Sequence, residues 1–413
     1  MRAPGEGCPR AAWEGAVSQR VTLGEVSERV DYGLTTSAVV DGDGPRFLRI
    51  TDIQNSFIDW PVVPHCKASP LEVAKFELRT GDVVVARTGG STGRSQWVKV
   101  DEPAVFASYL VRFRMKMNFC SRFIAYVLSS APWLHHVAGV AHGKSAQPNM
   151  SASEMARFEF NCPSLGEQRA IAEVLGALDD KIAANFAVAR TAEELLRADF
   201  ETWRTDEKPT RPRSSLRLTD LVELNPIVAR PTEEEPVYVD MQKMPVSGMS
   251  ITDWSSRPAK GGARFQNGDT LLARITPCLE NRKTGYVDFL SDGQIALGST
   301  EYIVMRSRSG IPLEFSYFIA TSEQFRTFAI RHMSGTSGRQ RVSAADLADF
   351  QLAVPDPSWL ESFGRKAGAL FELVKSQRDE NRTLAQTRDA LLPDLMSGQI
   401  RVKNAEKRVE EVL

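Results

Sequence analysis

The sequence lacks the features that mark several large classes of protein. No stretch approaches eighteen uninterrupted apolar residues and the N-terminal MRAPGEGCPRAAWEG holds no apolar signal core, so we expect a cytoplasmic protein without a membrane segment. The five cysteines are scattered without a C-x-x-C spacing, which gives no disulfide framework and favours a reducing compartment. His65 beside Cys66 and the pair His135, His136 have no partners at a metal-ligand spacing, so no metal site is predicted.

A strong overall charge is also absent. The formal net charge of -1 excludes a globally basic protein that coats DNA, although local basic patches remain open. A chain of 413 residues with 42% apolar residues can bury two or three modest cores.

The Gly143-Lys144-Ser145 stretch suggests a nucleotide phosphate loop, but its context is wrong. Such a loop needs a glycine five positions before the second glycine, and Ala138 stands there, whereas Gly139 is one residue too close. Pro148 also interrupts the place of the phosphate-binding helix. We therefore expect no nucleotide-binding function from this stretch.

An internal repeat is the strongest feature present. Gly81-Asp82 precedes an apolar run and Arg87, and 187 positions later Gly268-Asp269 precedes an apolar run and Arg274. Further on, GKSAQPNMSASEMARFEFNCP aligns with GTSGRQRVSAADLADFQLAVP at an offset of 192. The second copy of the Gly-Lys-Ser stretch loses its lysine, which indicates a variable polar loop in contact with an anionic partner.

Each repeat mixes strand and helix patterns. The segments 82–87, 107–115, 269–274 and 300–306 are predicted as strands from their β-branched content and length. The segments 121–130 and 313–330 have helical spacing. Each repeat is therefore expected to be an α+β domain of roughly 150 residues.

A long amphipathic helix is predicted after each domain. The first begins with a capping box formed by Ser164 and Glu167, and the second begins at PDPSWLE. In both, seam residues recur at steps of four and three, which is typical of a coiled coil of roughly five heptads. The first seam contains Ile171, Leu175, Leu178, Ile182, Asn185, Ala189, Ala192, Leu196, Asp199 and Trp203; the second contains Phe363, Ala367, Leu370, Val374, Gln377, Asn381, Leu384, Arg388, Leu391 and Leu395.

Asn185 and Asn381 fall at matching places in the two seams. A polar residue within an apolar seam weakens the pairing but fixes its register, so we assign these residues a register role. We favour pairing of the two helices with each other; the alternative is that each apolar stripe packs separately on its own domain.

The order of domains and helices resembles the DNA specificity subunit of type I restriction-modification systems. The resemblance covers nearly the whole chain and is most specific at GEQRAIAEVLGALDDKIAAN, residues 166–185, and at LLPDLMSGQI, residues 391–400. The second helix departs from the pattern because DPSWLESFGRK lacks the Glu-Gln pair of the first, which puts its detailed partner contacts in doubt.

The resemblance implies a fold and a domain plan. The fold would be α+β, with two similar target recognition domains separated by two long antiparallel helices that form a coiled coil, in a pseudo-twofold internal repeat. The domains would be residues 1–163, target recognition domain 1; 164–205, first spacer helix; 206–355, target recognition domain 2; and 356–413, second spacer helix and C-terminal tail.

The resemblance also implies a function. In that family the two domains each read half of a split, asymmetric DNA sequence, and the helices set the gap between the halves. The partners would be double-stranded DNA, two methyltransferase subunits and, where the system cuts DNA, restriction subunits. No cofactor is expected in this chain; AdoMet, and ATP with Mg for restriction, would bind partner subunits. The chain itself is expected not to be an enzyme, since it has neither a [DNS]-P-P-[YFW] motif nor a glycine-rich AdoMet loop.

The predicted DNA contacts lie in polar, glycine-rich, basic loops that recur in both copies. Arginine and glutamine suit bidentate contacts with guanine and adenine edges, while serine, threonine and lysine mostly anchor phosphates. An exposed loop side chain that touches nothing is the alternative for each, and Arg87 and Arg274 could instead form structural ion pairs. The set is Arg87, Thr88, Ser91, Arg94, Lys144, Ser145 and Gln147 in the first copy, and Arg274, Thr276, Lys283, Ser337, Arg339, Gln340 and Arg341 in the second.

A second function remains open. The repeated domains could bind another protein or a peptide, with a coiled coil that only dimerises. A specificity module of a fused or type II-like system would differ in its partner and not in its role.

Overall fold

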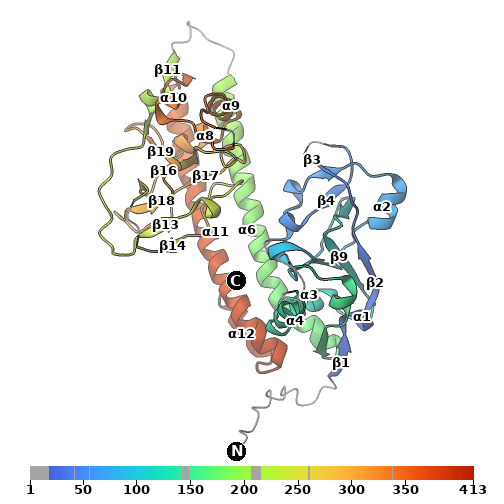
Figure 1. The fold of residues 1–413 in the computed structure, drawn as a ribbon. Helices are drawn as coiled ribbons and strands as arrows, with labels where there is room; N and C mark the ends of the chain where they lie inside the picture. The colour runs from blue at the N-terminus through green and yellow to red at the C-terminus, as the bar shows by residue number, and fades with distance from the viewer. Residues whose placement is uncertain are drawn as a thin grey trace, which may run out of the picture. The chain divides into compact units, whose positions relative to one another are not determined.

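The fold was analysed in a computed structural model that describes residues 18–40, 42–54, 56–141, 148–205, 215–258, 261–336 and 338–413. The chain divides into two compact units (Figure 1). Unit 1 comprises the described parts of 1–183 and 382–413, and unit 2 those of 184–381. Two helices of 41 residues each, α6 (Leu165–Thr205) and α11 (Pro357–Ser397), contribute one segment to each unit.

Unit 1 is built around an antiparallel sheet with strand order β2-β9-β6-β7. The predicted strands 82–87 and 107–115 are confirmed as β6 (Asp82–Ala86) and β9 (Leu110–Met115), which pair along their length. A second sheet has the order β3-β5-β4-β8. The other elements are β1 (Gln19–Thr22), α1 (Leu23–Val26), β2 (Ser27–Tyr32), β3 (Ala38–Val39), β4 (Arg46–Leu48), β5 (His65–Cys66), α2 (Pro70–Phe76), β7 (Ser95–Trp97), β8 (Ala104–Phe106), α3 (Ser121–Val127), α4 (Ala131–Ala141), α5 (Ala152–Ala156) and β10 (Glu159–Cys162).

Unit 2 repeats the main sheet with the order β12-β19-β16-β17. The predicted strands 269–274 and 300–306 are confirmed as β16 (Asp269–Ala273) and β19 (Tyr302–Ser307). The predicted helix 313–330 is two helices, α8 (Phe315–Thr321) and α9 (Glu323–Arg331), because Ser322 is extended and caps α9. The other elements are β11 (Ser215–Arg217), α7 (Leu218–Leu221), β12 (Val222–Leu224), β13 (Val237–Val239), β14 (Ser255–Ser256), β15 (Ala263–Phe265), β17 (Thr284–Tyr286), β18 (Ala296–Gly298), α10 (Ala344–Ala348) and β20 (Gln351–Ala353).

The repeated Gly-Asp pair has a structural role in both units. Gly81 has φ +98° and Gly268 has φ +90°, a left-handed conformation that favours glycine. The following aspartates are buried and pair with arginines on the neighbouring strand: Asp82 Oδ1 lies 2.7 Å from Arg114 Nε, and Asp269 Oδ1 lies 2.6 Å from Arg306 Nε. The repeated Gly-Asp pair is therefore explained by a turn and a buried ion pair, without any contact to DNA.

Hydrogen bonds fix the start of α6 on unit 1. The predicted capping box is present in part: the Glu167 N–H donates to Ser164 Oγ at 3.4 Å, and the Ser164 hydroxyl donates to Glu167 Oε2 at 3.1 Å. The second bond of a full box, from the Ser164 backbone N–H to the Glu167 carboxylate, is not formed between these two described residues. Gln168 is buried, and its Oε1 accepts from the Cys120 N–H at 2.9 Å while its Nε2 donates to the Pro163 carbonyl at 2.9 Å. The Glu-Gln pair thus joins the helix to the domain before it.

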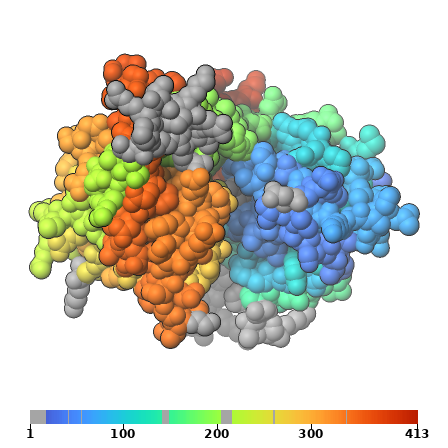
Figure 2. Space-filling model, turned by 90° about the horizontal axis from the view of Figure 1, so that it is seen from above, coloured from blue at the N-terminus to red at the C-terminus, as the bar shows by residue number. Residues whose placement is uncertain are grey.

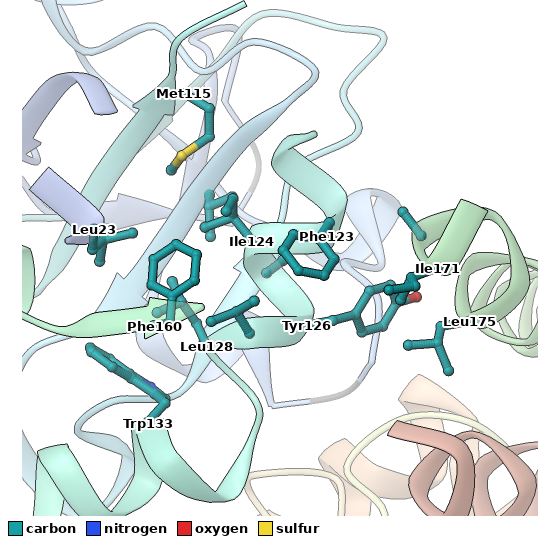
Figure 3. Packing of buried hydrophobic residues seen from close by; sticks show 14 of the residues in the cluster. Leu23, Met115, Phe123, Ile124, Tyr126, Leu128, Trp133, Phe160, Ile171 and Leu175 are labelled. Atoms are coloured by element: carbon teal, nitrogen blue, oxygen red, sulfur yellow. The ribbon is translucent and has the colours of Figure 1, made fainter. Parts of the chain in front are cut away.

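The core of unit 1 lies between the main sheet, α3 and both long helices. In Figure 3, Tyr126 on α3 points toward Ile171 and Leu175 on α6, and Phe123 and Ile124 fill the space behind it. Leu384, Leu391 and Leu395 of α11 belong to the same cluster, whose other members include Leu178 and Ile182. In unit 2, Leu196, Phe200 and Trp203 of α6 and Phe363, Phe371 and Val374 of α11 share a core with the domain. Both alternatives for the apolar stripes therefore hold at once: the helices pack on each other and on the domain of their unit.

The C-terminal segment is helical and packed, and so is more than a tail. After α11 ends, Gly398 has φ +71°, and the N–H of Gln399 donates to the Asp394 carbonyl at 2.9 Å. The chain then forms α12 (Val402–Glu410), whose Ala405 and Val409 are buried in the core of unit 1. The LLPDLMSGQI stretch therefore comprises the end of α11 and the turn that leads into α12, all within unit 1.

Candidate nucleic-acid interface

In unit 1, the two predicted loops meet at the end of β6. The Arg87 N–H donates to the Tyr109 carbonyl at 3.0 Å, and the Met150 N–H donates to the Arg87 carbonyl at 2.9 Å. The Gly89 N–H reaches the Pro148 carbonyl at 2.9 Å, which holds the loop after β6 against the residues before α5. Backbone pairing therefore brings together two polar segments some sixty residues apart.

Unit 2 has the same arrangement at the end of β16. The Arg274 N–H donates to the Glu301 carbonyl at 3.0 Å, and the Val342 N–H donates to the Arg274 carbonyl at 3.0 Å. The Thr276 N–H donates to the Gln340 carbonyl at 3.0 Å. Because the matched pairs keep the offsets of 187 and 192 seen in the sequence, the repeated loops have one common backbone design. In Figure 2 the first domain is coloured blue to cyan, and the part of unit 2 from β19 onward is coloured orange.

The predicted residues of the first loop differ in the contacts that they make within the protein. Arg87 places its guanidinium carbon 4.7 Å from the ring centre of Tyr32, so it forms a cation–π contact, and it has no ion pair with a residue that the structure describes. Thr88 pairs through its backbone with Asn149. Ser91 Oγ accepts from Gln54 Nε2 at 3.2 Å, and the exposed Arg94 donates to the Gln54 carbonyl.

In the second loop, Arg339 is exposed and its side chain has no hydrogen bond or ion pair to the residues that the structure describes. Lys283 Nζ donates to the Met241 carbonyl at 2.6 Å, and the Thr276 hydroxyl donates to the Gln340 carbonyl at 3.4 Å. Lys144, Ser145, Gln147 and Ser337 lie outside the described residues.

A carboxylate that the sequence did not single out joins two of the predicted arginines. Glu301 Oε1 lies 2.6 Å from Arg341 Nη2, and Glu301 Oε2 lies 3.3 Å from Arg274 Nε. Arg274 is therefore a structural ion-pair partner, the alternative raised for it above. The guanidinium groups, first that of Arg341, hold the pKa of the Glu301 carboxyl below its ordinary value. Two positive charges share one negative charge here, so the cluster keeps a net positive charge at neutral pH.

On the long helices, the structure brings the two seam asparagines together. Asn185 Nδ2 donates to Asn381 Oδ1 at 2.8 Å and to Glu380 Oε2 at 2.6 Å. Within the same unit, Asp199 Oδ2 accepts from Lys366 Nζ at 2.8 Å. The partner position on α11 falls as the position on α6 rises, so the two helices are antiparallel.

The acidic residues of LDDKIAAN also have structural partners. Asp179 is buried: its Oδ2 accepts from the Tyr126 hydroxyl at 2.6 Å and its Oδ1 accepts from Arg388 Nη1 at 2.6 Å. Asp180 pairs with Arg122 at 2.8 Å. Across the described parts of the chain, no group of three or more His, Cys, Asp or Glu side chains could hold a metal ion, and no helix is long and apolar enough to cross a membrane.

Comparison with known proteins places this arrangement in a class. Residues 21–188 match the family model of the type I restriction modification DNA specificity domain. Residues 21–188 are therefore similar to a domain of this family, and the resemblance of the chain to DNA specificity subunits of type I restriction-modification systems is confirmed.

Individual proteins that are similar to this chain are also specificity subunits of type I systems. The chain is 21% identical to the type I restriction enzyme HindI specificity subunit of Haemophilus influenzae, over 91% of this chain and 97% of that protein. It is 20% identical to the MjaIX specificity subunit of Methanocaldococcus jannaschii, over 70% and 71%. The solved S subunit of a type I system from M. genitalium has the same fold, with a TM-score of 0.54, 13% identity and coverage of 93% of this chain and 97% of that one.

Proposed function

We propose that this protein is the DNA-recognition subunit of a type I restriction-modification complex and has no catalytic site of its own. Each unit would read one half of a split, asymmetric target through the paired loops at the ends of β6 and β16. The observation that carries the proposal is the common backbone design of these loops with different side chains in the two units. A shared scaffold with variable polar loops is suited to reading two different half-sites.

The partners are those that the family resemblance implies, and the charge of the chain supports a need for them. Affinity for duplex DNA depends strongly on the number of phosphates neutralised, so a protein of net charge -1 is expected to bind DNA weakly alone. Two methyltransferase subunits would supply the missing contacts and the adenine methylation, with AdoMet bound to them. Where a restriction subunit joins the complex, it would use ATP and Mg to drive cleavage.

The two antiparallel helices would set the gap between the half-sites. Each helix of 41 residues is roughly 60 Å long, and half-sites read from one face of the duplex lie roughly 34 to 36 Å apart. Duplicating residues 186–192 and 374–380 together adds one heptad to each helix, which lengthens the pair by roughly 10 Å while the seam stays in phase. We expect both half-sites to be kept and the gap to grow by about three base pairs. Duplication in one helix alone is the control, and should abolish activity.

The methylated bases of a host genome, mapped by long-read sequencing with and without this gene, test the main proposal. The disappearance of one split, adenine-methylated motif on deletion is the expected result. The rival function is a scaffold in which the repeated domains bind a protein or peptide. An unchanged map in a host that expresses the complete complex, together with unaltered DNA binding by an Arg339→Ala, Arg341→Ala variant, would favour that rival.

A further inference from the structure

The side chain of Arg341 is fixed along one edge. Its Nε lies 2.9 Å from both carboxylate oxygens of Glu301, and its Nη2 lies 2.6 Å from Oε1. Arg274 approaches the same carboxylate from its own Nε. A guanidinium has five N–H donors, one on Nε and two on each terminal nitrogen. The pairing with Glu301 uses the Nε donor and one Nη2 donor, which leaves one N–H free on Nη2. On Nη1, at most one of the two donors is used, in a bond of 3.4 Å to the Arg339 carbonyl. The outer edge of Arg341 thus keeps a donor on each of its two terminal nitrogens.

The backbone of Arg341 is held on both sides. Its N–H donates to the Ser334 carbonyl at 2.8 Å, and its carbonyl accepts from the Ser334 N–H at 2.9 Å. A second bridge joins it to Ile275, next to Arg274. A side chain fixed at backbone and guanidinium loses little conformational entropy when it binds. Its side chain is nevertheless 40% exposed, so the free edge can be reached from outside.

Two parallel donors on an arginine edge match the O6 and N7 acceptors of guanine in the major groove. On the basis of the proposed function, we propose that Glu301 is a positioning residue that holds Arg341 to read one guanine in the half-site bound by unit 2. Arg274 completes the cluster by holding the second carboxylate oxygen of Glu301.

The described residues of unit 1 have no carboxylate-held arginine at the matching position. At the offset of 192, Tyr109 stands in the place of Glu301 and Asn149 in the place of Arg341. Arg87 is left with a tyrosine ring and no carboxylate. Among the described residues, the carboxylate-held arginine at this position belongs to the second half-site only, which is what an asymmetric target requires.

The test uses the complex assembled with its methyltransferase subunits and duplexes that carry its methylated motif. Each guanine in both half-sites is replaced singly by 7-deazaguanine, which lacks the N7 acceptor, and binding is measured for the wild type and for Arg341→Lys. At one guanine we expect the replacement to weaken wild-type binding by about 5- to 150-fold and to have little effect on Arg341→Lys, which keeps the charge but not the paired donors. An equal loss in both proteins at every guanine, or a motif without guanine, would overturn the proposal.

Glu301 is tested by its effect on specificity. Glu301→Ala should reduce the ratio of specific to non-specific DNA binding about 5-fold or more, with non-specific binding unchanged or stronger because a negative charge is lost. Glu323→Gln, which removes a carboxylate from the exposed pair with Arg326 and Arg282, is the matched control and should leave the ratio unchanged. Equal weakening of specific and non-specific binding by Glu301→Ala, or no change in either, contradicts the positioning role.

The guanine assignment and the proposed function can fail separately. A wild-type complex that methylates no defined sequence refutes the function. A wild-type complex with a defined split motif, and the same base preference in Arg341→Lys, refutes only the guanine assignment.

Discussion

Asn185 donates its side-chain amide to Asn381 Oδ1 at 2.8 Å, in the middle of two predominantly apolar seams. Asn185 is only 4% exposed, so loss of this bond leaves a polar group without a partner in a site that water reaches poorly. The pair is satisfied only when these two positions lie opposite each other, and so it favours one alignment of the helices.

The Asn185→Ala substitution should lower the free energy of unfolding by about 1 to 3 kcal/mol, measured as a shift of the urea midpoint. Replacing both asparagines by leucine should recover stability, because no unpaired polar group remains, but should allow other alignments of the helices. Thr191→Ala, at an exposed site on the same helix, is the control. If Asn185→Ala unfolds at the same urea concentration as that control, the bond between the two asparagines does not contribute to the free energy of unfolding.

The buried ion pairs after the two Gly-Asp turns should be among the most sensitive sites of each domain. Asp269 is fully buried, and its oxygens accept from Arg306 and from the Gln266 N–H at 2.8 Å. Asp269→Ala leaves an arginine without its partner and should cost about 3 to 5 kcal/mol in urea unfolding. Asp82→Ala repeats the test in unit 1. Asp253→Ala removes an exposed partner of Lys243 and should have little effect. Equal losses at positions 253 and 269 would contradict the importance of burial.

Arg339 is expected to contact a phosphate rather than a base, since its side chain is exposed and is not held by any described residue. In the assembled complex, Arg339→Ala should weaken binding to specific and non-specific duplexes alike. It should also reduce the slope of log affinity against log salt concentration by about 1. Arg20→Ala, in an exposed pair with Glu159 on unit 1, should leave the slope unchanged. A change of base preference in Arg339→Ala would instead assign this residue to base reading.

Local patterns predicted the central strands, the serine cap of the first long helix and the seams, because each depends on neighbours within a few residues. The internal repeat also identified the loops that pair at the ends of β6 and β16, since the loop residues of the two units match at the offsets of 187 and 192. Glu301 was missed for a physical reason: it meets Arg274 and Arg341 only after β16, β19 and the later loop come together, and its counterpart, Tyr109, gives no repeated residue to find.

Other features were hidden for the same reason. The contact of Arg87 with Tyr32 joins residues that are far apart in the domain sequence, and no spacing rule connects them. The break between α8 and α9 at Ser322 lies within a pattern whose apolar spacing continues through it. The burial of Asp179 depends on Tyr126 and Arg388, which lie far from it in the sequence, on α3 and α11.

The junction between the first domain and α6 can be tested through a thiol. Burial raises the pKa of the Cys162 thiol to about 11, and Gln168 Nε2 lies 3.2 Å from its sulfur. Since the thiolate is the reactive form, only about one in a thousand of these groups is ionised at pH 8 in the folded protein. Iodoacetamide at pH 8 should therefore label Cys162 far more slowly than the partly exposed Cys278, as followed by mass spectrometry of peptides.

The same measurement reports how firmly α6 is attached. Gln168→Ala removes the acceptor of the Cys120 N–H and the donor to Pro163, so the junction should open more often and Cys162 should react several times faster. Glu167→Ala removes only a half-buried side chain that hydrogen-bonds to Ser164, and it should change the Cys162 rate much less. Unfolding in urea should bring all cysteines to similar rates. A Cys162 rate that is the same in the wild type and in Gln168→Ala would show that the glutamine, although buried, does not hold the helix to the domain.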